Sequence, residues 1–193
     1  MTAAADLPLA HMRGIQRIWD HRVWGTMVGA VGATVFVMTN RGKLADPWPL
    51  VALAIWVLAL LAYVALVFVV PRAFGHLSKV GARQGVVYLG AVAGMLLLIF
   101  VGTIILDTAG KTDLRPALIV VAVGLHFLPF AGAFHTRMFI PLGITMAVLG
   151  LAGLILGWMT DARSAAATAV ITGIVMLTFM ATDAGRAART PRG

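Results

Sequence analysis

Long apolar stretches alternate with short polar segments along this chain, and the pattern predicts six membrane-spanning helices. Each stretch is close to the roughly 20 apolar residues that a helix needs to cross a bilayer. The predicted spans are residues 23–39, 48–70, 85–106, 116–134, 140–159 and 165–181. The connections between them are short, so neighbouring helices are expected to form antiparallel hairpins. The sequence therefore predicts an all-α fold, a polytopic integral membrane six-helix bundle in one domain, 1–193.

The two ends of the chain carry weaker patterns. Met12, Ile15, Trp19 and Val23 recur at helical spacing, with arginines elsewhere on the wheel. This spacing predicts an interfacial amphipathic helix over 9–22 that leads into the first span, and a helix that docks a partner would show the same pattern. Residues 183–193 are expected to form a frayed basic tail.

Composition supports a membrane protein and limits its chemistry. The chain of 193 residues is 61% hydrophobic and 11% charged, whereas a soluble domain is about 45–50% apolar and about 25% charged. It has no cysteine, which excludes disulfides and thiolate metal sites. All seven acidic residues are aspartates at the end of a span or outside one, which weakens any proton path that needs a buried carboxylate. Basic residues are mostly arginine, which is typical of a bacterium with a GC-rich genome.

The flanking charges orient the predicted bundle. Ten basic residues lie on the side of the two termini and five on the other. Under the positive-inside rule this favours both termini in the cytoplasm, with the chain in the bacterial cytoplasmic (inner) membrane. The net charge of +8 is scattered over short loops and tails, so its expected partner is the bilayer with its anionic headgroups, not nucleic acid.

His126 is the only Asp, Lys, Arg or His deep inside a predicted span. It lies ten residues into the span 116–134, about 15 Å deep at about 1.5 Å per residue. Pro129 follows and cannot donate an N–H to the carbonyl of Leu125, so we expect a kink beside the histidine. A carbonyl freed in this way needs another donor. Candidate partners by residue type are Tyr63, Thr103, Tyr88, Thr145 and Thr172.

Three roles for His126 follow from this position. A neutral imidazole that hydrogen-bonds across helices would fix their register. An ionisable group at this depth is also typical of a proton or solute pathway. Metal or haem ligation is the weakest of the three, because the other four histidines lie outside the spans and no second deep ligand exists. No metal site and no cofactor is therefore predicted.

Small residues predict how the helices approach one another. Gly25, Gly29 and Ala33 repeat in the first span and Gly90 and Gly94 in the third, and a third set, Ala147, Gly150, Gly153 and Gly157, occupies the fifth. Such faces let backbones pack closely in lipid. The partner of each face is either a helix of the same chain, or a homo-oligomer or other membrane protein.

Motif searches return no GxSxG, no HExxH and no phosphate-binding glycine-rich loop, so an enzyme is the least favoured class. The stretch GLHFLP at 124–129 resembles a motif of small bacterial multi-span membrane proteins, and that resemblance implies no activity. Two functional hypotheses remain. The favoured one is transport or permeation of a proton or small solute past His126 and Pro129; the alternative is a non-catalytic structural or accessory subunit of a membrane complex.

Overall fold

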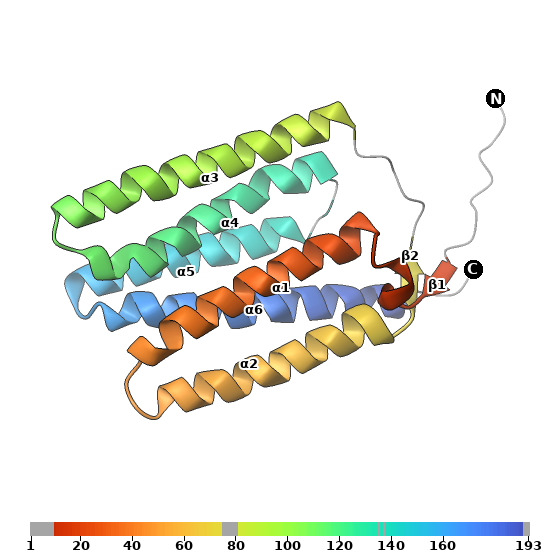
Figure 1. Ribbon diagram of the computed structural model, residues 1–193, viewed down its shortest axis with the longest axis horizontal. Helices are drawn as coiled ribbons and strands as arrows, with labels where there is room; N and C mark the ends of the chain where they lie inside the picture. Colours follow the sequence, from red (N-terminus) through yellow and green to blue (C-terminus); the bar gives the residue numbers. More distant parts are fainter. Residues whose placement is uncertain (1–9, 75–80, 135, 137, 191–193) are drawn as a thin grey trace.

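Six long helices form the chain, as the computed structural model shows for residues 10–74, 81–134, 136 and 138–190. They are α1 (His21–Asn40), α2 (Trp48–Val64), α3 (Ala82–Thr108), α4 (Arg115–Phe134), α5 (Phe139–Met159) and α6 (Arg163–Ala188). With the turns that adjoin them, all six are long and apolar enough to cross a membrane. The helices run along the long axis of the molecule (Figure 1), and β1 (Ala10–Met12) lies at the same end as the C-terminus of α6. The predicted all-α six-helix bundle is confirmed.

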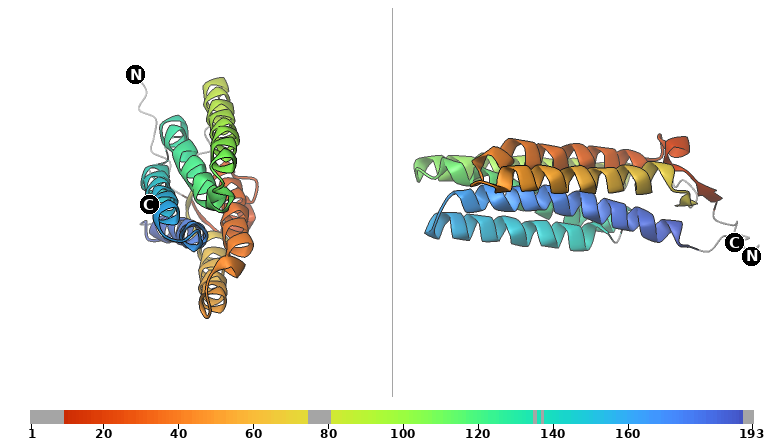
Figure 2. Two further views of the ribbon diagram at one scale, coloured as in Figure 1. Left: turned by 90° about the vertical axis from the view of Figure 1, so that its left-hand side faces the viewer. Right: turned by 90° about the horizontal axis from the view of Figure 1, so that it is seen from below.

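Helix α6 is the centre of the bundle. In its most apolar stretch 61% of the residues are buried, against 6% for α3. It packs against α1, α5, α2 and α4, whereas α3 packs chiefly against α4. Helices α2 and α3 therefore lie at opposite edges, as the end-on view in Figure 2 shows. Most of the surface of α3 is available to lipid or to another protein.

Glycines on α4 and α5 bring these two backbones into contact. A Cβ at Gly124 would come within 2.6 Å of the backbone nitrogen of Ala147, and one at Gly150 within 2.6 Å of that of Val121. The small face predicted in the fifth span is thus used inside the chain. A Cβ at Gly90 or Gly94 of α3 would meet nothing within 4 Å, so that small face has no partner among the described residues.

The helix predicted over 9–22 is not formed, and this prediction was wrong for the described part of the segment. Ala10–Met12 forms strand β1, which pairs antiparallel with β2 (Arg72–Phe74). Gly14–Arg17 is a 3₁₀ turn, and Asp20 caps α1 by accepting from the backbone N–H of Arg22. Gly14 packs against the backbone carbonyl of Val67, and the Cβ of any other residue at this position would collide with that carbonyl. Contacts distant in sequence override the local helical periodicity here.

Two other predicted boundaries also changed. The span 48–70 ends in a π-helical turn, Ala65–Val69, instead of continuing as an α-helix. The tail predicted from residue 183 is helical as far as Ala188, because α6 extends seven residues beyond the predicted end of its span. Its last turns pack beside β2 and the π-helical turn, so they are held by tertiary contacts.

Candidate functional site

His126 lies in the middle of α4 and is half-buried. Its Nδ1 is hydrogen-bonded to the carbonyl of Val123, one turn earlier on the same helix. A carbonyl can only accept, so Nδ1 carries the proton, and in the neutral imidazole Nε2 carries the lone pair. The imidazole is therefore bonded within its own helix and, among the described residues, does not link α4 to a neighbour.

Aromatic rings surround His126. The ring centroids of Phe127 and Phe130 lie 4.3 Å and 5.1 Å from the imidazole. Phe130 stacks on Tyr88 of α3 at 5.5 Å, and Phe127 stacks on Phe139 of α5 at 5.4 Å. We call Tyr88, His126, Phe127, Phe130 and Phe139 the aromatic cluster. It joins three helices, and the groups recorded against the imidazole are aromatic rings and not carboxylates.

Pro129 and Leu125 lie beside His126 on the surface of the bundle. Helix α4 continues through Pro129, and the side chains of both residues are exposed. The carbonyl that Pro129 leaves without an N–H belongs to Leu125, whereas the imidazole bonds to that of Val123. The imidazole therefore does not satisfy the carbonyl of Leu125.

Tyr63 and Thr103 lie apart from His126. Tyr63 is buried, and its hydroxyl donates to Oγ1 of Thr26 on α1 at 3.3 Å. Thr103 follows Gly102, which packs against Leu118 of α4. Leu118 is eight residues from His126, about 12 Å along a helix axis. Tyr88 reaches the histidine only indirectly, through the ring of Phe130.

The core between the two ends of the bundle has little polarity. The buried polar residues among those described are Asp20, Asn40, Arg72, Thr168 and Thr172. The two threonines lie on α6, and their hydroxyls donate to the carbonyls of Ala165 and Thr168 on the same helix. Within the described ranges no three His, Cys, Asp or Glu side chains gather as metal ligands. The described part of the core thus holds no chain of ionisable groups from one face to the other.

A second polar site, which the sequence analysis missed, lies at the end of the bundle that holds β1. Arg72 of β2 is 6% exposed, and its Nε and Nη2 have no hydrogen-bond partner within the described chain. Its guanidinium lies 4.8 Å from the ring centroid of Phe74, and that of Arg17 lies 5.5 Å from the same ring. Among ten basic residues on this side of the sequence, no local pattern marked Arg72 as the buried one.

Arg72 is a costly residue to bury. Burial lowers the pKa of its guanidinium from the usual value, whereas the carboxylates of Asp183 and Asp20 raise it. An arginine stays charged at any physiological pH. Removing such a charge from water costs on the order of several kcal/mol unless hydrogen bonds replace the lost hydration. Two of its donors lack that compensation in this structure.

Comparison with known proteins gives no indication of function. No known protein family, curated protein or solved structure matches this chain. The aromatic cluster around His126 and the buried Arg72 are therefore interpreted from their own contacts.

Proposed function

We propose that this chain is a non-catalytic accessory subunit of a membrane assembly, which it contacts through the α3–α4 side of the bundle. One observation carries the proposal. His126 is half-buried at the middle of a predicted span, and its only hydrogen bond among the described residues is to its own helix. The other ring nitrogen is thus available to a group outside the chain.

The energetics of the bilayer support this interpretation. A polar group that faces hydrocarbon without a partner costs several kcal/mol by transfer estimates, and no water is available at that depth. A hydroxyl or amide on another transmembrane helix would satisfy Nε2 and gain roughly 0.6–2 kcal/mol. The exposed helix α3, with the open face at Gly90 and Gly94, offers such a partner a surface beside the histidine's helix.

Passage of a proton or small solute is the second candidate. It is favoured by the tautomer of His126, whose Nε2 lone pair is free to take up a proton at the middle of the membrane. Against it, the described core offers only helix-bonded threonine hydroxyls between its two ends. A pathway would have to run along the outside of α4, between this chain and a neighbour.

The proposal includes a location and an orientation. An arginine-rich bundle with ten basic residues on the side of its termini is expected in the cytoplasmic membrane of a bacterium, with both termini inside. The structure supports the shared side, because the first and last described elements, β1 and α6, end at the same end of the bundle (Figure 1).

The native size of the assembly tests the proposed function. The tagged chain is extracted from its own membranes in a mild detergent, and the stoichiometry of co-purifying polypeptides is measured. We expect a defined partner with the wild-type chain and its loss from His126→Phe, which keeps an aromatic ring but removes the nitrogens. Leu58→Phe on α2, a side chain 67% exposed at the opposite edge, is the matched control and should keep the partner. A partner retained by His126→Phe would overturn the proposal.

A further inference from the structure

Two arginines share one phenylalanine ring at the end of the bundle where β1 pairs with β2. The guanidinium carbons of Arg72 and Arg17 lie 4.8 Å and 5.5 Å from the ring centroid of Phe74. Arg72 has two buried donors without a partner, Nε and Nη2, and Arg17 has one, Nε. Two like charges that lie near one ring repel each other, and the two side chains together have three donor nitrogens that no described group accepts from.

The free edge of Arg72 is the one that binds oxyanions. The Nε and Nη2 groups of a guanidinium form a planar fork that matches two oxygens of a carboxylate or a phosphate. Arg115 of this chain uses the same edge, with its Nε and Nη2 at 3.1 Å and 2.6 Å from Oδ1 of Asp107. The equivalent edge of Arg72 has no hydrogen-bond partner among the described residues, although this side chain is far more buried than Arg115.

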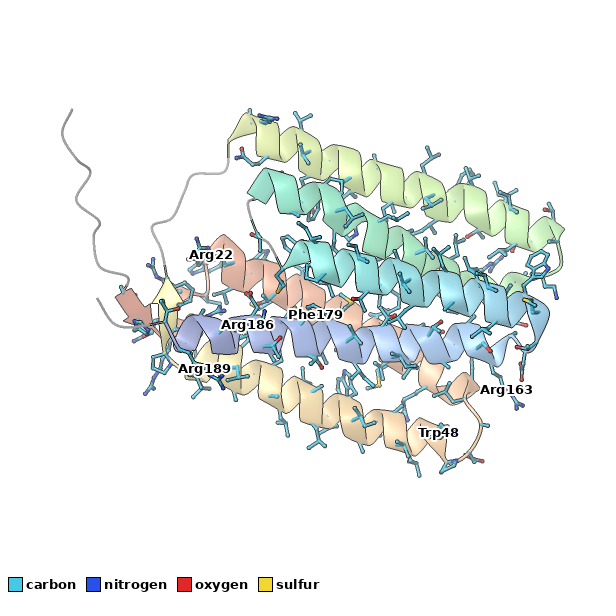
Figure 3. The ribbon with its side chains drawn as sticks, turned by 180° about the vertical axis from the view of Figure 1, so that it is seen from behind. Arg22, Trp48, Arg163, Phe179, Arg186 and Arg189 are labelled. Carbon is cyan, nitrogen blue, oxygen red and sulfur yellow. The ribbon has the colours of Figure 1, made fainter. Side chains whose placement is uncertain are left out.

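The charged groups around Arg72 have a net positive charge, which favours the binding of an anion. Two more arginines, Arg22 and Arg186, interact electrostatically with Arg72 or with Asp183. The negative groups are the carboxylates of Asp20 and Asp183. With Arg72 itself and Arg17, these groups carry four positive and two negative charges among the described residues. Figure 3 shows Arg22, Arg186 and Arg189 gathered at this end, while Arg163 lies at the other. A bound phosphate would offset part of this positive excess.

The position of the site indicates the source of that anion. Trp19 and Trp24 stack on each other at 6.2 Å beside the start of α1, and they are 87% and 51% exposed. Exposed tryptophans at the end of a span are typical of the headgroup level of a bilayer. At that level the most abundant anion is the phosphate of a phospholipid.

We propose that Arg72 and Arg17 form a binding site for one phosphate group, supplied by a phospholipid headgroup at the β1 end of the bundle. The fork of Arg72 binds two phosphate oxygens, and Nε of Arg17 donates to a third. Strand β1 and the turn Gly14–Arg17 cover the site, and elements of three and four residues open more readily than the long helices. The headgroup enters when they move aside.

Native mass spectrometry of the full chain in lipid-free detergent tests this site. The probes are short-chain phosphatidic acid, the matching diacylglycerol and inorganic phosphate. We expect one bound phosphatidic acid and no bound diacylglycerol. Arg72→Lys keeps the charge but removes the fork, and should weaken binding about tenfold. Arg189→Lys, at an exposed arginine of the same end, should bind within about twofold of wild type, because it makes the same change outside the proposed site.

Each result decides one part of the proposal. Phosphatidic acid bound equally by wild type and Arg72→Lys would overturn the site. Inorganic phosphate bound as tightly as the lipid would overturn the headgroup as its source and leave a site for free phosphate. If Arg72→Lys does not fold, Arg17→Lys carries the same test, and unchanged binding there overturns the shared site.

Discussion

At the scale of single residues, the histidine predicted to matter and the arginine that the sequence did not single out have opposite environments. His126 is bonded to its own helix and lies against the rings of Phe127 and Phe130. Arg72 is buried beside charged groups and has unused donors. The first residue was visible in the sequence because it interrupts an apolar run. The second lies directly after one and resembles any loop arginine.

The stability of His126→Phe separates a packing role from a contact outside the chain. In the isolated protein this change removes one hydrogen bond to a backbone carbonyl and replaces the imidazole of the aromatic cluster with a phenyl ring. We expect the free energy of unfolding in detergent to change by less than about 1 kcal/mol. A loss above about 2 kcal/mol would instead show that the imidazole bonds across helices and fixes their register.

At the scale of elements, the helices could be predicted and the contacts between them only in part. Apolar length alone located all six spans, because a bilayer requires it. The segment 9–22 was misassigned because β1 depends on β2, some sixty residues away in the sequence. Helical periodicity does not record such pairing. Gly150 and Gly94 likewise look alike in the sequence, and only the fold shows which one faces a backbone.

Matched glycine substitutions test this element-scale packing. Gly150→Ala places a methyl group 2.6 Å from the backbone nitrogen of Val121, which cannot move without shifting α4. We expect it to destabilise the bundle by about 1–3 kcal/mol. Gly94→Ala meets open space, and its effect should lie within about 0.5 kcal/mol. Thermal unfolding of both variants in detergent gives the comparison; equal losses would contradict the assigned helix contacts.

At the scale of the whole molecule, the bundle is organised around α6 and leaves α3 at one edge. Its two ends differ in charge, which predicts its orientation in the membrane. Because the chain has no cysteine, that orientation can be tested by labelling single introduced cysteines. Single cysteines are placed at Ala109, in the turn after α3, and at Arg189, after α6. A membrane-impermeant maleimide should label Ala109→Cys in intact cells and Arg189→Cys only after permeabilisation. The reverse pattern would invert the proposed orientation.

The whole-molecule account also explains why the function was harder to predict than the fold. A lone histidine at the middle of a predicted span is compatible with a pathway, a register bond or a partner contact. The three roles require different groups beside the imidazole, and a single sequence does not specify which group lies there. The ring of Phe130, and behind it Tyr88, occupies part of that space.

Flux through liposomes that contain only this chain tests the central claim most directly. The claim is that the isolated bundle provides no pathway of its own and that His126 acts through another protein. With an imposed pH gradient, we expect wild type, His126→Phe and protein-free liposomes to show the same rate of proton entry. A wild-type flux well above the empty liposomes that His126→Phe abolishes would contradict the account and establish the passage hypothesis.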